Sequence, residues 1–348
     1  MPSTAPGVPD IDDQLATSIV ERLGTIEHGS RDAVASSDDM VRWTARHLMD
    51  AGGKRVRPML VLLAASLGDV DAEGVQDAAI LVELTHLASL YHDDVMDSAP
   101  TRRGTDSAHS LWGNNVAILT GDFLFARASA LSARIGREAV RMHSETFERL
   151  CLGQPHETVG PAEGDDPFAH YISVLSDKTA SLLALAGDLG ASLAGAPEGS
   201  DDVMRRYGEK VGVAFQLADD VLDLESDAAA SGKTPGIDLR EGVPTMPTLL
   251  VRRRAAERRD ARDLEILRRL DSDLSDDTAL GELVELLRED EALEETRRLA
   301  QRTADEAVEI LGESPRGPVP EALRRPSPAR SSSAVAELLV RSATVPSA

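Results

Sequence analysis

Cysteine and aromatic residues are scarce in this sequence, which narrows the possible folds. Only one cysteine, Cys151, occurs among 348 residues, so the chain can form neither an intramolecular disulfide nor a cysteine-based zinc site. A single thiol fits a reducing compartment, and we expect Cys151 to be a small buried hydrophobe. Aromatic residues make up only 3%, while Ala, Leu and Val dominate the apolar fraction of 42%. This mixture predicts an all-α fold.

Long uncharged apolar runs are also missing. No stretch of about 18 apolar residues lacks a charge, so we expect no helix that spans a membrane. Residues 1–13 have neither the basic nor the apolar region of a signal peptide, and we expect them to be disordered. Together these absences predict a cytoplasmic protein.

Positive charge is in short supply. Lys and Arg number 37 against 60 Asp and Glu, which gives a formal net charge of −23. Such a chain repels nucleic acid and anionic membrane surfaces. We therefore expect no nucleic-acid partner, and local cations or metal ions would have to attract any anionic substrate.

Apolar residues recur at intervals of three and four along most of the chain, a spacing typical of helices. The expected helical segments are two within 11–52, then 59–67, 75–96, 114–133, 140–152, 168–193 and 203–224. Glycine-bearing polar stretches predict loops at 195–199 and 231–242. Residues 252–311 are laced with Glu and Arg, which predicts charged amphipathic helix at a solvated periphery.

The predicted organisation is one domain with flexible ends. Length alone would allow one domain or two. We expect an all-helical domain over 14–312, a Pro- and Ser-rich linker over 313–333, and a short C-terminal helix and tail over 334–348. No alternating strand pattern of useful length is present.

Aspartate pairs occur seven times, and most have the character of turns or helix caps. Only the pairs that begin at Asp93 and Asp219 have a third Asp four positions after the first, at Asp97 and Asp223. Both motifs lie in apolar context, and the spacing places the outer carboxylates on one helix face. These carboxylates repel each other unless a cation lies between them, and oxygen ligands of this kind suit Mg²⁺ with a substrate phosphate. Either motif alone could still be an N-cap or a surface run.

Basic residues form a second pattern. The segment GGKRVRP places Lys54, Arg55 and Arg57 in a loop that opens a helix, and Arg102 and Arg103 follow the first aspartate motif. Arginine suits bidentate contact with phosphate, and a helix N-terminus adds backbone donors. Any one of these residues could be a solvated loop residue, but the set predicts binding of a diphosphate.

With these motifs in order, the chain resembles the trans-prenyl diphosphate synthases, also called polyprenyl synthetases. The resemblance spans residues 52–248 and consists of GGKRVRP (52–58), ELTHLASLYHDDVMD (83–97), RRG (102–104), GD (121–122), GQ (153–154), DKT (177–179), FQLADDVLD (215–223) and GKTPGIDLREG (232–242). It implies the isoprenoid synthase fold, which is one all-α domain of long helices around a central cavity. It also implies a homodimer that uses Mg²⁺ to condense isopentenyl diphosphate head to tail with an allylic prenyl diphosphate, releasing diphosphate.

The resemblance implies roles for individual residues. The side chains that would bind the diphosphate of isopentenyl diphosphate are Lys54, Arg57, His86 and Arg103. Those that would contact the allylic diphosphate are Arg102, Lys178, Thr179, Gln216 and Lys233. The principal Mg²⁺ ligands would be Asp93, Asp97 and Asp219, supported by Asp94, Asp220 and Asp223. The residues implied to act directly in catalysis are Asp93, Asp97, Asp219, Lys178 and Arg102. Taken alone, His86 would more simply be a hydrogen-bonded core histidine.

Small residues precede the first aspartate motif on the same helix. Ser89 and Ala88 lie four and five positions before Asp93, one turn deeper in the expected cavity. In short-chain relatives a bulky aromatic residue near these positions forms the cavity floor, so its absence implies that a growing prenyl tail passes toward Thr85. We therefore expect a medium- or long-chain product of at least geranylgeranyl length. Aromatic residues of a neighbouring helix could be a lower floor or ordinary core, namely Phe123 and Phe125.

One departure from the family pattern falls after the second aspartate motif. Val243 follows Glu241 and Gly242 where a lysine is common in the family, so a cationic contact to the allylic diphosphate is missing or supplied elsewhere. Two alternatives stay open. A class I terpene cyclase would share the fold, although its second metal motif usually mixes Asp or Asn with Ser or Thr and Glu. A non-catalytic prenyl-binding subunit of a heteromeric synthase would be expected to have lost metal ligands.

Overall fold

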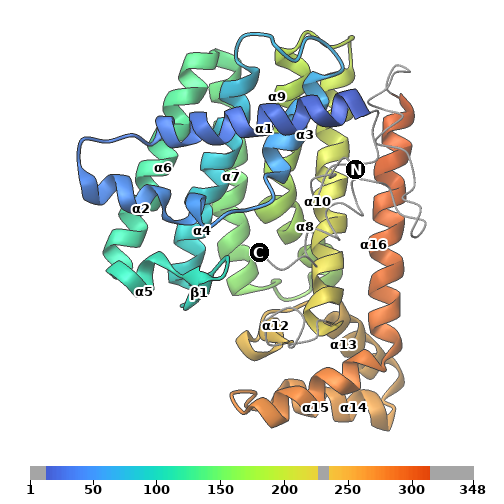
Figure 1. Cartoon of the computed structure of the whole chain (residues 1–348). Helices are drawn as coiled ribbons and strands as arrows, with labels where there is room; N and C mark the ends of the chain where they lie inside the picture. Colours follow the sequence, from blue (N-terminus) through green and yellow to red (C-terminus); the bar gives the residue numbers. More distant parts are fainter. Residues whose placement is uncertain (1–12, 226–234, 314–348) are drawn as a thin grey trace.

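Helices form nearly all of the part of the chain that the computed structural model describes, residues 13–225 and 235–313 (Figure 1). The prediction of an all-α fold is confirmed. The helices are α1 (Asp13–Ala33), α2 (Asp39–Asp50), α3 (Val56–Ala65), α4 (Val75–Met96), α5 (Ala108–Trp112), α6 (Asn114–Ile135), α7 (Arg137–Val159), α8 (Pro167–Leu175), the π-helical turn η1 (Ser176–Ala180), α9 (Ser181–Leu193), α10 (Ser200–Glu225), α12 (Ile237–Glu241), α13 (Met246–Arg258), α14 (Ala261–Leu270), α15 (Asp277–Arg288), α16 (Glu291–Ile310) and the 3₁₀ turn η2 (Leu311–Glu313).

The observed helices differ from the expected ones mainly in where they break. The segment 168–193 is divided into α8, η1 and α9. The predicted loop at 231–242 contains the short helix α12, while residues 226–234 lie outside the described residues. Residue 313 of the predicted linker ends η2, while the rest of the linker, the C-terminal helix and residues 1–12 also lie outside the described residues.

A very short hairpin is the one β element in the described part of the chain. Strand β1 (Thr101–Arg102) pairs antiparallel with β2 (Thr105–Asp106). The two turn residues, Arg103 and Gly104, both have positive φ, 54° and 75°, as a tight two-residue hairpin turn requires. Strands of two residues are too short to leave an alternating pattern in the sequence. The hairpin fixes the direction of the two arginines that follow the first aspartate motif.

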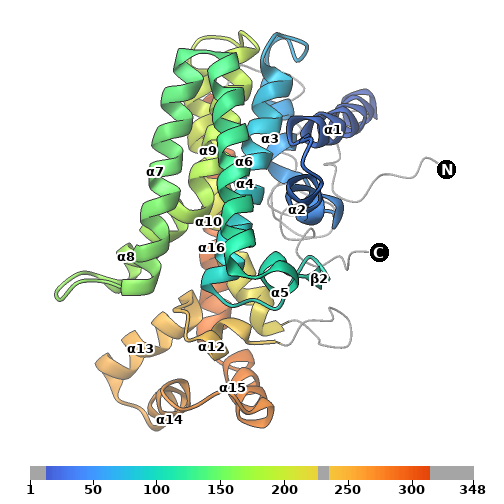
Figure 2. The same cartoon turned by 90° about the vertical axis from the view of Figure 1, so that its left-hand side faces the viewer.

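The main core lies between α3, α4, α6, α9 and α10, with α4 in the middle of the bundle (Figures 1 and 2). Helices α3 and α9 are apolar nearly all round, so both are buried on most of their surface. Glycines let the helix axes approach closely. A Cβ on Gly190 of α9 would lie 2.3 Å from the Val61 carbonyl oxygen of α3, and one on Gly208 of α10 would lie 2.4 Å from that of Leu183. This close packing fixes α3, α9 and α10 relative to one another.

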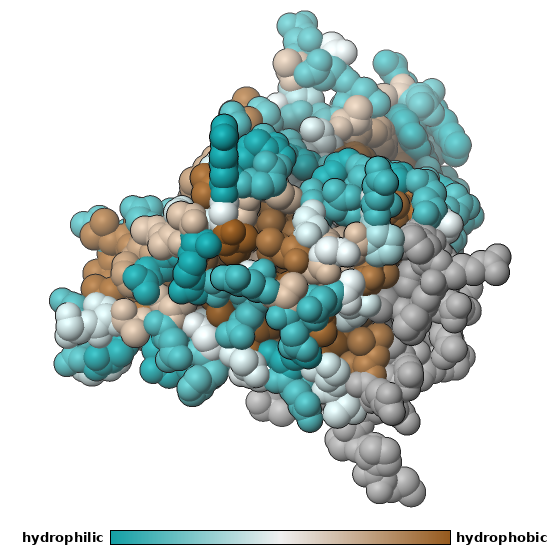
Figure 3. Space-filling view, turned by 90° about the horizontal axis from the view of Figure 1, so that it is seen from above, coloured by the Kyte–Doolittle hydropathy of each residue, from teal (hydrophilic) through white to brown (hydrophobic). Residues whose placement is uncertain are grey.

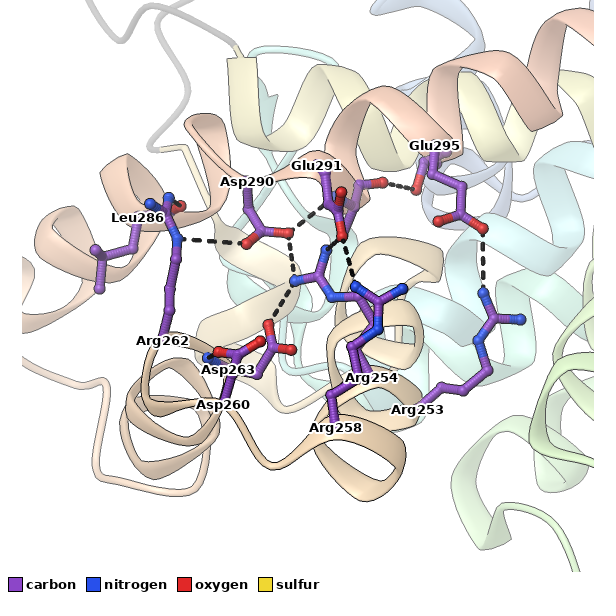
Figure 4. A network of polar contacts seen from close by, with 12 residues as sticks. Arg253, Arg254, Arg258, Asp260, Arg262, Asp263, Leu286, Asp290, Glu291 and Glu295 are labelled. Carbon is purple, nitrogen blue, oxygen red and sulfur yellow. Dashed lines mark hydrogen bonds and ion pairs between the residues drawn. The ribbon is translucent and has the colours of Figure 1, made fainter.

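Residues 252–311 form charged amphipathic helices, as predicted, but they also contain buried residues. They belong to four helices, α13 to α16, of which α13, α14 and α15 form a layer below the main bundle (Figure 2). Leu250, Ile266 and Leu283 of this layer are buried in an apolar core that it shares with α8, α10 and α16. Arg254 is also buried there, and its guanidinium group bonds to two buried aspartates (Figure 4). The helices of this region thus carry charged residues on one face, while their apolar faces pack against each other.

The outer face of α6 and α7 overturns the prediction for Cys151. Cys151 is exposed and not buried, because it lies with Leu152 on the side of α7 that faces away from the core. Within the described residues, α6 alone is long and apolar enough to span a membrane by length and composition, and 39% of the relevant window is buried. The charged residues Asp122 and Arg127 interrupt the apolar sequence of this helix, which packs against α4, α5 and α7.

Candidate active site

Both aspartate motifs lie in the last turns of their helices, at the same end of the bundle. The first ends α4 and the second is near the end of α10, and Figure 1 shows the two helix ends above α12, with the β1 hairpin close to the end of α4. The C-terminus of a helix carries partial negative charge, which adds to that of the carboxylates and favours a bound cation. The two motifs were predicted to share one site, and their helices end on the same side of the molecule.

In the first motif, the three aspartates point in different directions. Asp93 is partly buried, and burial raises its pKa to about 6, with Asp97 adding to the rise and Lys178 opposing it. Asp97 caps α4 and is exposed. Asp94 is fully buried and accepts a hydrogen bond of 2.6 Å from Arg102 Nε. Asp93 and Asp97 are therefore free to bind a cation, whereas Asp94 holds the arginine of the hairpin.

The second motif divides in the same way. Asp219 is exposed, whereas Asp220 is buried and accepts hydrogen bonds from the Tyr171 hydroxyl at 2.6 Å and the Met246 amide at 2.9 Å. Burial raises the pKa of Asp220 to about 8 despite these bonds. Asp223 accepts from the Ile237 amide at 3.3 Å, which ties α10 to the start of α12. The middle aspartate of each motif thus turns toward the protein.

Three further acidic residues belong to this site and were missed from the sequence: Glu157, Asp238 and Glu241. Burial, together with the charges of Asp223 and Asp219, raises the pKa of Asp238 to about 7. Burial and Asp97 raise the pKa of Glu241. Glu157 contributes to the raised pKa values of both Asp93 and Asp238, so the two motifs belong to one electrostatic site. Asp238 and Glu241 lie in the motif GKTPGIDLREG and Glu157 closely follows GQ, so their positions beside family motifs were the available signal.

Lys178 brings a cation to these carboxylates. It lies in the π-helical turn η1, and its Nζ donates to Glu157 Oε2 at 2.5 Å. Burial opposes its charge, but Glu157 and then Asp93 raise the pKa of the ammonium group above its ordinary value. Gly153 is required opposite this turn, because a Cβ there would lie 2.9 Å from the Lys178 amide. Irregular turns of this kind occur often at functional sites.

The other residues predicted to contact the allylic diphosphate lie on several different elements. Thr179 follows Lys178 in η1, and Gln216 lies on α10 one turn before Asp219, both partly buried. Arg102 is on the hairpin, where it bonds to Asp94. Lys233 lies outside the described residues.

The predicted isopentenyl site is a second group of cations, between α2, α3, α4 and the hairpin. Arg103 Nη1 donates to the carbonyl oxygens of Leu48, at 2.8 Å, and of Gly52. The pKa of Arg57 is lowered to about 10, mainly by burial; the buried Glu83 opposes this change and Arg103 adds to it. Burial and then Arg57 and Arg103 lower the pKa of His86 well below its ordinary value, so His86 is neutral near pH 7. Lys54 is exposed on the loop that opens α3.

The acidic residues fit Mg²⁺ that arrives with a substrate. Within the described ranges, no three His, Cys, Asp or Glu side chains gather closely enough to form a complete metal site. Asp93 and Asp238 nevertheless carry raised pKa values because burial and neighbouring carboxylates disfavour their charges. Mg²⁺ typically binds through one or two carboxylates plus substrate phosphates, and this arrangement would relieve that repulsion.

A family model described as polyprenyl synthetase matches residues 38–288. The chain belongs to the polyprenyl synthetase family. The nonaprenyl diphosphate synthase of Mycobacterium tuberculosis is 42% identical over 289 residues, covering 82% of this chain and 85% of the relative. The heptaprenyl diphosphate synthase component 2 of Geobacillus stearothermophilus is 34% identical, covering 83% and 88%. A crystal structure of geranylgeranyl pyrophosphate synthase from Corynebacterium glutamicum, complexed with calcium and isoprenyl diphosphate, is similar with a TM-score of 0.80 and 38% identity, covering 95% and 98%.

As a member of the polyprenyl synthetase family, the chain is a prenyltransferase with the isoprenoid synthase fold. The predictions of family, fold and reaction class are confirmed. The roles assigned to individual residues stay predictions.

The residues predicted to set product length in this polyprenyl synthetase are on or beside α4. Ala88 is fully buried against α6, where its carbonyl oxygen would lie 3.1 Å from a Cβ on Gly121. Ser89 is only partly buried. Thr85 is buried and its hydroxyl lies 3.0 Å from His143 Nε2 of α7, and Phe123 packs partly buried against the main core.

Aromatic residues of α6 and α7 form a cluster at this depth that the sequence did not indicate. The rings of Phe125 and Phe147 lie 4.4 Å apart, and the ring of His143 stacks 6.5 Å from that of Phe147. From the sequence, Phe125 could be either a lower floor of the cavity or an ordinary core residue. Its partners come from α7, which no spacing within α6 could reveal.

Proposed function

We propose that this chain catalyses the Mg²⁺-dependent head-to-tail condensation of isopentenyl diphosphate with an allylic prenyl diphosphate. The observation that carries the proposal is the pairing of one acidic site with two separate groups of cations. Arg102 and Lys178 lie among the aspartates, whereas Arg57 and Arg103 lie, partly buried, in the group beside α3. Two diphosphates need two such groups, and only one of them needs metal ions.

The proposed reaction follows from this division. The carbon–oxygen bond of the allylic diphosphate breaks, and its electron pair leaves with the diphosphate beside Lys178 and Arg102. The double bond of isopentenyl diphosphate, held by Lys54, Arg57 and Arg103, attacks the allylic cation to form the new carbon–carbon bond. A proton is then lost to the released diphosphate, which restores a double bond. The cationic side chains stabilise the charge that develops on the leaving group.

Mg²⁺ would be held by the outward-facing aspartates, Asp93, Asp97 and Asp219. When bound, it would supply neutralisation of the departing diphosphate. The raised pKa of Asp93 supports this role, as does the relative from Corynebacterium glutamicum whose complex contains calcium and isoprenyl diphosphate. Asp94 and Asp220 would support the site from behind, through Arg102 and Tyr171.

We propose a product of geranylgeranyl length or longer. Residues 88 and 89 are small, and the nonaprenyl and geranylgeranyl synthases among the relatives fit this range. Because Ala88 is packed against α6 and Ser89 is less buried, a large ring at position 89 should enter the prenyl channel with less distortion of the helices. Ser89→Phe is therefore expected to shorten the product, whereas Ser89→Ala should leave it unchanged. An unchanged product length in Ser89→Phe, measured by mass spectrometry, would contradict the proposal that position 89 lies on the prenyl channel.

We also propose a cytoplasmic homodimer joined through α6 and α7. The apolar side chains Leu119, at 66% exposure, and Ile118, at 40%, are exposed on α6, which lies beside α7 (Figure 2). Val140 and Leu152 of α7 add to it. In the view from above, apolar surface appears along the left margin, on the side where α2 and α6 lie in Figure 1 (Figure 3). Contiguous apolar surface of this kind is typical of interfaces. Leu119→Glu is expected to give monomers by sedimentation velocity, and a dimeric variant would exclude this face.

The decisive experiment incubates the purified chain with isopentenyl diphosphate and either farnesyl or geranylgeranyl diphosphate, followed by mass spectrometry. Extension in five-carbon steps that depends on Mg²⁺ supports the proposal. Consumption of the allylic diphosphate without isopentenyl diphosphate would indicate a cyclase instead. One relative is described as a heptaprenyl diphosphate synthase component 2, so the experiment also asks whether this chain is active alone. A chain that is inactive alone but binds prenyl diphosphate would be a subunit of a heteromeric synthase.

A further inference from the structure

Arg55 is the buried centre of the loop that carries the predicted isopentenyl site. It is 8% exposed and begins α3 in the left-handed conformation, with φ 50°. Its guanidinium group donates to four acceptors. They are Glu27 Oε1 at 3.1 Å, Glu83 Oε1 at 3.0 Å, and the carbonyl oxygens of Met49 at 2.9 Å and Gly52 at 3.1 Å. A left-handed arginine is an unfavourable backbone state, so these contacts have to hold it there.

Glu83 is the buried partner among these acceptors. It is 3% exposed and lies on α4, the helix that carries the first aspartate motif, whereas the side chain of Glu27 is 37% exposed. The charge of Glu83 also raises the pKa values of Arg57 and Arg103, against the lowering effect of burial. One buried carboxylate thus faces three arginines.

The loop rests directly on two of these guanidinium groups. A Cβ on Gly53 would lie 2.6 Å from Arg55 Nη1 and 2.8 Å from Arg103 Cζ, so the backbone passes over both in contact. Both arginines also donate to the Gly52 carbonyl oxygen. Displacement of Arg55 would therefore move the backbone that places Lys54 and Arg57.

We propose that Glu83 is a positioning residue for isopentenyl diphosphate. Its carboxylate holds Arg55, and Arg55 fixes the 52–57 loop so that Lys54, Arg57 and Arg103 meet one diphosphate. This inference rests on the proposed function, because it assigns the binding defect to one of the two substrates. It does not give Glu83 any contact with the substrate.

Loss of the Glu83 charge has two consequences of opposite sign for diphosphate binding. As a mere negative charge near an anion site, Glu83 weakens diphosphate binding, so its removal should tighten binding. As the partner of Arg55, it keeps clustered guanidinium groups in place, so its removal leaves them uncompensated and free to separate. If Glu83 is a positioning residue, the second effect dominates and binding weakens.

The experiment measures steady-state kinetics of Glu83→Gln in the full-length chain with both substrates varied. We expect the KM for isopentenyl diphosphate to rise about tenfold, which corresponds to about 1.4 kcal/mol, while the KM for the allylic diphosphate changes less than about twofold. Arg55→Lys keeps the charge beside Glu83 but not the fork of donors, so it should give the same selective rise. The matched control is Asp263→Asn, which also neutralises a buried acid bonded to an arginine but lies in the lower helical layer. It should lower thermal stability without changing either KM.

Four outcomes would overturn the positioning role. They are a lower KM for isopentenyl diphosphate in Glu83→Gln, equal rises for both substrates, an unchanged KM with a loss of stability like that of Asp263→Asn, and a normal KM in Arg55→Lys. If Glu83→Gln fails to fold, Arg55→Lys decides the matter alone. An inactive wild-type chain would instead refute the proposed function. Calorimetric titration with isopentenyl diphosphate would then still test whether Glu83→Gln weakens binding.

Discussion

Two buried arginine clusters in this protein have opposite charge balance. Beside α3, three arginines, Arg55, Arg57 and Arg103, face one fully buried carboxylate, Glu83. In the lower layer, Arg254 alone donates to Asp263 at 2.6 Å and to Asp290 at 2.7 Å (Figure 4). The first cluster has positive charge left over for an anion, whereas the second has none. Buried arginines in excess of carboxylates indicate an anion-binding site, whereas an arginine bonded to two carboxylates, as Arg254 is, indicates a structural contact.

The lower cluster joins three helices. Arg254 belongs to α13 and Asp263 to α14, while Asp290 is the N-cap of α16 and accepts from the Ala292 amide at 2.8 Å. Arg262 adds an outer contact to Asp290 at 3.6 Å. Within the described part of the chain, the Arg254 side chain bonds to carboxylates of the lower layer and not to the aspartate motifs, so we expect this cluster to affect function through stability alone.

The largest effect is expected for Arg254→Met. The substitution leaves two buried aspartates without their cation, which typically destabilises a fold by about 3–5 kcal/mol. Urea unfolding should show this loss, while the KM values of the remaining folded protein stay unchanged. Arg258→Met is the matched control. Arg258 is exposed and its Nη1 lies 3.6 Å from Glu291 Oε1, which makes a weak ion pair. Its loss should change the free energy of unfolding by less than about 0.5 kcal/mol. Equal effects of the two substitutions would abolish the contrast.

Arg57→Gln should have the opposite profile. Arg57 lies among like charges, and burial holds its pKa down at about 10, so the folded protein gains little stability from it. Loss of a charged hydrogen bond to a phosphate corresponds to about 1.5–3 kcal/mol, or roughly a 10- to 100-fold higher KM for isopentenyl diphosphate. Unfolding should show unchanged or increased stability. A marked loss of stability would place Arg57 with Arg254 in the structural class.

The smallest effect is expected for His86→Gln and depends on pH. Burial and the nearby arginines keep the pKa of His86 well below 6.5, so the folded protein resists protonation that the unfolded chain accepts. Stability from the neutral ring is fully present above about 6.5 and is lost as pH falls below it, by up to about 1.4 kcal/mol per unit. His86→Gln should flatten this decline between pH 7 and 5.5 in thermal unfolding. An equally steep decline in the variant would show that other groups cause it.

The sequence predicted most of the acidic site because the relevant spacing is local. The i, i+4 interval places Asp93 with Asp97, and Asp219 with Asp223, on one face of any helix. It could not distinguish the middle aspartates, since Asp94 and Asp220 are turned inward by Arg102 and Tyr171, which come from other elements. Asp238 and Glu241 were missed for a different reason, because α12 has only five residues and leaves no periodic signal.

The sequence by itself determined the all-α class, the helices and the family, because helical periodicity and ordered motifs are properties of short segments. Tertiary structure decided which polar groups are buried and against what. Residues 252–311 are charged in sequence yet enclose a core and Arg254, whereas the apolar region around Cys151 faces outward. The balance of charge around a buried arginine depends on contacts between distant segments, such as Arg55 with Glu83. For that reason only the fold could show that Arg55 and Arg254 are held by buried carboxylates.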